Sequence, residues 1–469
     1  MNVDLNLKFL FFRWKVSISR QWVQFGIILA VILLSVVISY WGSSRIMVLI
    51  PILIGSIIGL IVLLKQINLG FVLILLAGMF VPFEGPGGVN AAVLAVAALV
   101  GLWLADMFIV KKEFTFIRTR VFMPVIFMLV ISVIAFGMGR LPWFLFANQA
   151  PLDSQIGGFA IFILSMGLML ATAHLITDVK WLKMIVWIFI GLGGAYILGR
   201  SLQLPVDRLY RIGYTANSMF WVWLVALSFS QVVYNRGLKK HIRGLLIIIT
   251  LLTFYVAVVQ AYDWKSGWVP PLAVVGVILG LRYPRLLILA IPLALIAVGN
   301  VAIGLIASDE YSWGTRVDAW IIVLEISKVS PIFGLGFSNY YFYTPLFPIR
   351  GWRVSFNSHS QFVDLIAQVG ILGLFCFLWI FFEAGRLSWR MLNKLPNGFS
   401  QSYSYGVLAG IVGTLVAAFL VDWVLPFVYN IGFNGFRASI LPWMFIGGLI
   451  AVEYINFGTK SNLQRGHNG

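Results

Sequence analysis

The chain has 469 residues, of which 61% are hydrophobic and 10% are charged. Soluble domains are about 45–50% apolar and about 25% charged, so this composition excludes a soluble globular enzyme, a disordered scaffold and a nucleic-acid-binding protein. The formal net charge of +17 instead indicates loops that orient across a bilayer, because Lys and Arg concentrate on the cytoplasmic side of membrane proteins. The single cysteine, Cys376, excludes an intramolecular disulfide and a cysteine-based metal cluster.

Fourteen segments are apolar enough to cross a membrane as helices, for which about 20 residues are needed. They are residues 22–41, 45–64, 67–82, 89–110, 121–137, 156–176, 181–200, 216–234, 242–260, 268–282, 283–304, 361–385, 405–425 and 436–455. Three are short, and the pair that meets at Arg282–Arg285 allows a different division. The sequence therefore predicts an all-α polytopic membrane protein with 12–14 transmembrane helices, in which residues 1–469 form one membrane domain.

The orientation follows from the basic residues in the connecting segments. Lys8, Arg13, Lys15 and Arg20 precede a first span of full length with no small-residue cleavage site after it, so this tail is expected to be a cytoplasmic anchor. With the N-terminus inside, the inner segments hold about twice as many Lys and Arg residues as the outer segments. Both termini are therefore expected in the cytoplasm.

Most of the predicted outer arginines fall in two loops, residues 200–215 and 305–360. A positive cluster on the face that normally avoids it indicates an anionic ligand. The alternative is that the arginines anchor the protein at the membrane interface by snorkelling. Loop 305–360 is the longest polar segment between spans, and its aromatic content indicates an ordered structure.

The interiors of the spans are nearly free of charge. Asp106, Glu383 and Glu453 fall near predicted cytoplasmic ends, and Asp364 and Asp422 fall near predicted outer ends. Transporters usually carry ionisable groups at mid-membrane, so this distribution favours chemistry at the outer membrane surface.

His359 is the only histidine predicted on the outer face. Ser358 and Gln361 have the spacing of a capping box, which predicts that His359 is the first residue of a helix. The positive end of the helix dipole disfavours an imidazolium there, and a neutral imidazole is what a general base requires. The alternative is a histidine that only helps to cap the helix.

A short amphipathic helix is predicted on the outer surface before Pro331. Thr315 is its expected N-cap, which puts Arg316 in the first turn and Asp318 at N3. Its apolar residues recur at spacings of three and four: Val317, Trp320, Ile321 and Leu324. Glu325 and Lys328 are expected to pair on the wet face. The alternative for Arg316 is a surface ion pair with Asp318.

Two further patterns follow in the same loop. Gly334 and Gly336 permit a tight turn and the close approach of a ligand to the backbone. An aromatic run comes next: Tyr340, Tyr341, Phe342, Tyr343, Phe347 and Trp352. It is interpreted either as a platform for sugar rings or as an interfacial belt.

The other outer loop carries Arg200, Arg208 and Arg211, which together are able to grip a diphosphate. Arg211 is nearest the following span and is expected to be the best oriented. Asp207 is expected to neutralise Arg200 or Arg208.

These residues resemble a known pattern. Arg316 with Trp320 four positions on, then P-I-F-G-L-G-F, then S-H-S-Q-F-V-D-L-I-A-Q-V-G-I-L-G-L resembles the signature region of the O-antigen ligase and O-antigen polymerase family over residues 314–374. Arg211-Ile212-Gly213-Tyr214 resembles the family's upstream arginine segment, although Thr215-Ala216-Asn217 stands where the family often has Asn-Pro.

The resemblance implies a metal-independent glycosyltransferase without a cofactor. Such an enzyme moves a preassembled glycan from undecaprenyl diphosphate to a hydroxyl acceptor, itself a glycan or lipid-linked glycan, on the outer face of the bacterial cytoplasmic membrane. It implies that His359 is catalytic and that Arg316 and Arg211 hold the diphosphate, with Arg208 as a further candidate.

Supporting roles are expected for other residues near the site. Asp318 is expected to orient Arg316, and Asp364 is expected to orient Gln361 or His359. The alternatives are a flippase for lipid-linked sugars and a non-catalytic assembly partner. The choice between ligase and polymerase stays open, as do the roles of Arg200, Arg350 and Arg353.

Overall fold

The structure of the protein is a computed structural model that describes residues 66–112, 117, 119–285 and 310–458. The chain divides into two compact units, Met1–Ile67 and Asn68–Gly469, and all that follows concerns the second. The predicted spans 22–41 and 45–64, the basic N-terminal tail and nearly all of span 283–304 lie outside the described residues.

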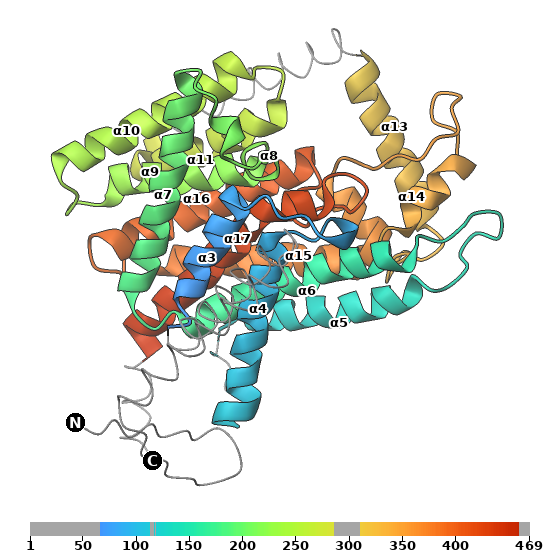
Figure 1. Ribbon diagram of the computed structural model, residues 1–469, viewed down its shortest axis with the longest axis horizontal. Helices are drawn as coiled ribbons and strands as arrows, with labels where there is room; N and C mark the ends of the chain where they lie inside the picture. Colours follow the sequence, from blue (N-terminus) through green and yellow to red (C-terminus); the bar gives the residue numbers. More distant parts are fainter. Residues whose placement is uncertain (1–65, 113–116, 118, 286–309, 459–469) are drawn as a thin grey trace, which may run out of the picture. The chain divides into compact units, whose positions relative to one another are not determined.

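The described part of the chain consists of helices joined by loops (Figure 1). The helices are α3 (Leu69–Phe80), α4 (Ala91–Ala105), α5 (Phe122–Met138), α6 (Leu152–Leu175), α7 (Val179–Ser201), α8 (Ile212–Thr215), α9 (Ser218–Tyr234), α10 (Lys240–Phe254), α11 (Lys265–Arg282), α13 (Glu310–Ser327), α14 (Asn339–Tyr343), α15 (Gln361–Met391), α16 (Phe399–Leu420) and α17 (Gly432–Glu453). Within the described ranges no strand forms, which confirms the prediction of an all-α protein.

The predicted spans that fall within described residues all coincide with helices. Seven helices in the described residues are long and apolar enough to cross a membrane, and the apolar helices α3, α5 and α9 are shorter. The chain is therefore a polytopic membrane protein. The predicted total of 12–14 spans includes segments outside the described residues and stays a prediction.

Helix α17 is the central helix of this unit and packs against α6, α9, α15 and α16 (Figure 1). Every residue from Phe436 to Val452 is buried. A helix that is apolar around its whole circumference belongs in an interior, so α17 supports the other helices.

Polar side chains fix the starts of several helices. The Asn90 side chain accepts from the Ala92 and Val93 amides at the start of α4. The Asn217 side chain accepts from the Met219 amide at 2.9 Å at the start of α9. Such caps satisfy amides that have no partner within the helix.

Helix α15 is interrupted at Gly370, where φ is 73° and ψ is −176°. Segment 331–336 lies along the interruption: the Leu335 amide donates to the Ala367 carbonyl at 2.8 Å, and the Ile371 amide donates to the carbonyl at the start of the segment at 2.9 Å. The interruption therefore frees backbone groups that the protein itself satisfies, as the interior of a bilayer requires.

Gly334 and Gly336 make this close pairing possible. Both have positive φ, at 73° and 86°. A Cβ atom on Gly334 would lie 2.5 Å from the Gln368 carbonyl carbon, and one on Gly336 would lie 2.2 Å from the Gly139 Cα atom. The backbone that these glycines admit is the protein's own, so the structure gives them a packing role in place of the predicted approach to a ligand.

The packing role predicts a large difference between two glycine substitutions. Gly351 also has positive φ, but nothing lies within 4 Å of the position of its Cβ. Gly351→Ala is expected to cost about 1–2 kcal/mol for the left-handed conformation alone. Gly336→Ala is expected to cost about 1–3 kcal/mol more from overpacking. Thermal unfolding of the purified variants measures both, and equal losses would refute the packing role.

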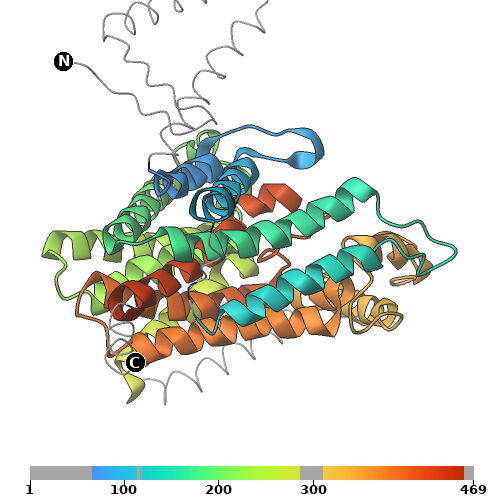
Figure 2. The same cartoon turned by 90° about the horizontal axis from the view of Figure 1, so that it is seen from below.

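Helices α5 and α15 run side by side (Figure 2). The loop between α5 and α6, helix α13 and helix α14 all lie toward the end of α15 at which that helix begins (Figure 2). The predicted site residues His359 and Gln361 belong to this end, because α15 starts at Gln361.

Candidate active site around His359

His359 lies just before α15, which begins two residues later than the sequence predicts. The N-cap residue is Ser360, and its side chain makes no cap hydrogen bond. Ser358 Oγ instead donates to the Ser360 carbonyl at 2.9 Å and accepts from the Ser360 amide at 3.2 Å. The predicted capping box is therefore wrong, because the Ser358 hydroxyl binds the backbone of Ser360 and closes a tight turn.

The backbone of His359 is left-handed, with φ of 50°. Residues other than glycine rarely adopt this conformation, and such residues cluster at functional sites, where the surrounding structure holds them. His359 therefore precedes the N-cap Ser360 and is not the first residue of the helix.

The imidazole is nevertheless expected to be neutral near pH 7. Burial lowers the pKa of His359 most, the Asp422 carboxylate raises it, and the Arg316 guanidinium lowers it. The net shift is downward from the usual value of 6.5. The sequence predicts an uncharged imidazole because of the helix dipole. The structure also favours an uncharged imidazole, but the main reason is burial of the ring, to which the nearby Arg316 cation adds.

Asp422 is the carboxylate of this site, and the sequence did not single it out. It is fully buried, and burial raises the pKa of its carboxyl group while His359 lowers it. The Asn357 side-chain amide donates to Asp422 Oδ2 at 3.0 Å and lies 3.5 Å from His359 Nδ1. Asn430 donates to Asp422 Oδ1 at 2.6 Å. Asn357 therefore lies between the carboxylate and the imidazole.

The location of Asp422 explains why its role was missed. The sequence places it inside span 405–425, but α16 ends at Leu420 and Val421 is extended. Pro426 is the sequence feature that predicts an early end of α16, because the residues before a proline tend to leave the helical conformation. Residues 421–431 therefore form a connecting segment rather than the last turn of a span.

Arg316 approaches the site from α13. That helix begins at Glu310, so Arg316 lies about two turns into it rather than in its first turn. Arg316 Nη1 donates to the Leu420 carbonyl at 3.3 Å. This carbonyl is the last of α16, where the negative end of the helix dipole favours a cation. The structure thus brings Arg316, His359 and Asp422 together.

Trp320 connects α13 to the turn that contains His359. Its indole N–H donates to the Ser358 carbonyl at 2.7 Å, and its ring packs edge-on against Phe419 with centroids 5.5 Å apart. The buried face of α13 is formed by Ala319, Val323 and Ile326. The predicted apolar face is only partly right, because Ile321 and Leu324 are exposed.

The ion pair predicted for Glu325 forms, whereas Asp318 pairs with a different arginine from the one predicted. The pair of Glu325 and Lys328 is confirmed, with Oε2 and Nζ 2.5 Å apart. Asp318, which was expected to orient Arg316, accepts from Arg350 Nε at 2.8 Å. Asp318 therefore ties Arg350 to α13, and one of the contacts of Arg316 is with the Leu420 carbonyl.

Gln361 and Asp364 bind segments that flank His359. Gln361 Oε1 accepts from the Leu425 amide at 2.8 Å, which fixes the 421–431 segment. Asp364 accepts from the Tyr340 hydroxyl and from Gln368 Nε2, the latter at 3.1 Å. In the described part of the chain no hydrogen bond joins Asp364 to the side chain of Gln361 or His359. Asp364 instead contacts the histidine turn through the Ser358 side chain and through Tyr340, whose hydroxyl accepts from the Ser358 amide at 3.4 Å.

The aromatic run mostly packs within the protein. Tyr340 and Tyr343 are fully buried, and Tyr341 stacks on Tyr429 with centroids 4.6 Å apart and planes within 8°. Trp352 is 67% exposed. The run therefore forms part of the core beneath α13, and Trp352 is its exposed member.

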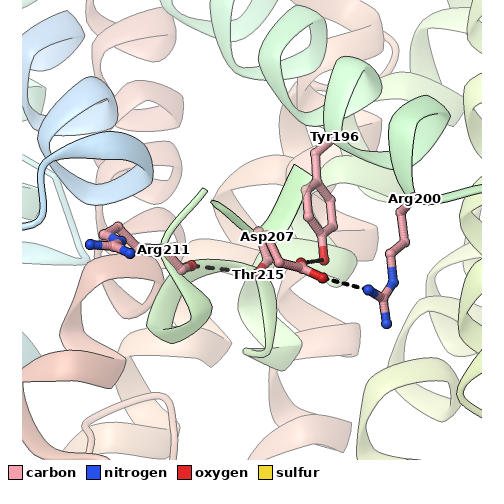
Figure 3. A network of polar contacts seen from close by, with 5 residues as sticks. All are labelled: Tyr196, Arg200, Asp207, Arg211 and Thr215. Atoms are coloured by element: carbon pink, nitrogen blue, oxygen red, sulfur yellow. Dashed lines mark hydrogen bonds and ion pairs between the residues drawn. The ribbon is translucent and has the colours of Figure 1, made fainter. Parts of the chain in front are cut away.

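The second predicted arginine group splits into separate environments (Figure 3). Arg200 pairs with Asp207, which also accepts from the Tyr196 hydroxyl at 3.2 Å. Arg208 is exposed. Asp207 thus neutralises Arg200, in line with the prediction.

Arg211 points away from this ion pair (Figure 3). Its backbone amide donates to the Met79 carbonyl at 2.8 Å, and its carbonyl accepts from the Thr215 amide. The buried Arg437 of α17 lies within electrostatic range of it. Arg211 and Arg437 are therefore two nearby cations beside α8, and Glu84 lies within electrostatic range of Arg437.

The segment between α16 and α17 connects both arginine regions. One end carries Asp422 of the histidine site. At the other end, Gly213 packs so closely on Asn434 that a Cβ atom would lie 2.2 Å from the Asn434 side-chain oxygen. Asn217 Nδ2 donates to the Gly435 carbonyl at 3.1 Å. Arg211 therefore belongs to a segment that docks on the first turn of α17, and His359 lies beside the connection that precedes α17.

The described residues contain no group of three or more His, Cys, Asp and Glu side chains that could hold a metal ion. Among the described residues, the Arg316 guanidinium and the Asp422 carboxylate both act on the charge of His359.

Comparison with known families gives one match. Residues 212–378 match the family model described as O-antigen ligase. This range contains Arg316 and His359 and begins one residue after Arg211. The chain matches no curated protein. The family match confirms the resemblance seen in the residues: residues 212–378 of this multi-pass membrane protein are similar to the O-antigen ligase family.

Proposed function

We propose that the protein is a metal-independent glycosyltransferase that moves a preassembled glycan from undecaprenyl diphosphate to a hydroxyl group of an acceptor glycan or lipid-linked glycan. The single observation that carries this proposal is the grouping of three side chains: Asn357 contacts both His359 and the buried Asp422 carboxylate, and Arg316 binds the Leu420 carbonyl two residues before Asp422. The match of residues 212–378 to the O-antigen ligase family supports it.

The reaction is a single displacement. The acceptor oxygen forms a bond to the anomeric carbon while the bond from that carbon to the diphosphate oxygen breaks, so the anomeric configuration inverts. The acceptor proton passes to His359, and the electron pair of the broken bond leaves on the diphosphate. A positioned base contributes about 10²–10⁴-fold to such a step.

Asp422 and Arg316 stabilise opposite charges that develop during the reaction. Asp422 stabilises the imidazolium that forms when His359 takes the proton, because its carboxylate raises the pKa of that histidine. Arg316 binds the diphosphate oxygens on which negative charge develops, and a guanidinium fork suits this because it donates two parallel hydrogen bonds. Arg211 binds the diphosphate from the α8 side, with exposed Arg208 as a weaker contact.

The proposed location is the outer face of the bacterial cytoplasmic membrane, with both termini in the cytoplasm. The excess of Lys and Arg in the segments that would then lie inside supports this orientation. Membrane lipids surround the helices, and the donor's polyprenyl chain enters from the outer leaflet.

The test is a reaction with purified full-length protein. It is incubated with a lipid-linked oligosaccharide and candidate acceptors, with and without a chelator, and products are followed by mass spectrometry. The expected result is a new glycosidic bond that forms equally well with chelator present. Transport of the lipid-linked sugar across a vesicle membrane without any new bond would favour a flippase and overturn the proposal.

A further inference from the structure

A cavity lies at the opposite end of α15 and α16 from His359. It has a volume of about 330 Å³, and it is lined by the end of α9, the start of α10, the end of α11 and the connection between α15 and α16. Ligand sites have volumes of about 300–1,000 Å³. The cavity therefore suits a small group rather than a whole lipid or glycan.

Three arginines line this cavity: Arg236, Arg243 and Arg282. None of its lining residues carries a carboxylate. Arg243 Nη2 donates to the Asn235 carbonyl at 2.8 Å, while Arg243 Nε is buried without a hydrogen-bond partner. An unsatisfied charged donor in the wall of a cavity indicates an anionic ligand, because such a group is costly to leave unpaired.

The frame around the arginines is built from stacked and hydrogen-bonded side chains. Tyr234 and Tyr405 lie with their planes within 2°, and the Tyr234 hydroxyl donates to the Ile278 carbonyl at 3.0 Å. Gln401 Nε2 donates to the Leu392 carbonyl at 3.0 Å. These contacts join α9, α11 and α16 at the helix ends that carry the cavity.

A neighbouring cavity of about 430 Å³ shares the same turn between α9 and α10. Its walls include the cations Lys183 and Lys239 and the apolar side chains of Trp187, Ile242 and Phe399. The first cavity would accept an anionic head group, and the neighbouring cavity would accept an apolar part of the same ligand.

We propose that the arginine cavity binds a phosphate-bearing anion at a site separate from the one that carries out glycan transfer. The arginines offer planar forks that match phosphate oxygens. The phosphate has two possible sources, the headgroup of an anionic phospholipid and a soluble phosphate compound. Basic pockets between transmembrane helices on the cytoplasmic side bind anionic headgroups, and the predicted orientation puts this end inside.

Binding to purified full-length protein tests the proposal. Native mass spectrometry measures retention of phosphatidylglycerol and cardiolipin against phosphatidylcholine, and calorimetry measures binding of inorganic pyrophosphate. The variant Arg236→Gln/Arg282→Gln removes two exposed cations of the cavity. It is expected to weaken binding of at least one phosphate probe about tenfold or more, because charge-assisted hydrogen bonds are lost. Glycan transfer is expected to be unchanged.

A matched control removes the same charge elsewhere. Lys111→Gln/Lys180→Gln changes two exposed lysines, whose side chains are 59% and 90% exposed, and is expected to bind the probes as the parent protein does. Loss of lipid retention alone in the arginine variant identifies a headgroup, and loss of pyrophosphate binding identifies a soluble phosphate. Equal binding by the arginine variant and the lysine control would overturn the proposal. Arg243→Gln provides a second variant within the same wall.

Discussion

His359→Ala is expected to lower the rate of glycan transfer by about 10²–10⁴-fold, because the acceptor hydroxyl loses its base. The donor's affinity should change little, since the proposal assigns binding of the diphosphate to arginines. The rate is measured with purified protein at saturating donor, and the amount of folded protein is checked by size-exclusion chromatography. A loss of rate with normal folding assigns the proton transfer to this side chain.

A second histidine provides the matched control. His241 is exposed in the first turn of α10, so His241→Ala is expected to retain full activity. Full activity in the His359→Ala protein at normal abundance would rule out His359 as the base. A loss caused only by misfolding would instead appear as reduced yield and a broadened elution profile.

Arg316→Gln is expected to lower transfer by about 10²–10³-fold, the size of effect seen when one stabilising donor is removed from a developing oxyanion. Arg316→Lys is expected to recover only part of the activity, because an ammonium group keeps the charge but lacks the guanidinium fork. Measuring kcat and KM for the donor separates the two effects. A change confined to KM would show that Arg316 binds the donor but does not stabilise the transition state.

Arg353 supplies the control for the loss of one outer arginine. It is exposed, and Nη1 donates to the Pro345 and Leu346 carbonyls at 3.4 Å each. Arg353→Gln is expected to leave kcat unchanged. If Arg353→Gln and Arg316→Gln lowered transfer equally, a general need for outer positive charge would replace the specific role of Arg316.

The helices were readable from the sequence because hydropathy over about 20 residues reflects the bilayer itself, which each span meets independently. Helix ends were less predictable because tertiary contacts set them. Ser358 has the right spacing to cap a helix, yet its hydroxyl closes a turn onto Ser360, and the Trp320 indole binds the Ser358 carbonyl. No local pattern reports that second contact, 38 residues away.

The partners of the site residues were also set by long-range contacts. Asp422 meets the histidine turn through Asn357, 65 positions earlier in the chain, and Arg316 meets the Leu420 carbonyl, 104 positions later. Sequence spacing favoured the near pair of Arg316 and Asp318, whereas folding brings Arg350 to Asp318. The proximity of Arg316 to His359 was therefore predicted from the sequence, whereas their contacts with Leu420, Asn357 and Asp422 were not.

The pH dependence of transfer tests the central claim most directly. A neutral His359 is required, so activity is lost as the pH falls through its pKa, and the lowered pKa places this acidic limb below 6.5. Arg316→Gln is expected to move the limb to higher pH, because Arg316 lowers the pKa of His359. Asp422→Asn is expected to move it to lower pH, because Asp422 raises that pKa. A limb that stays in place in both variants, or that moves the same way in both, would contradict an uncharged His359 as the base.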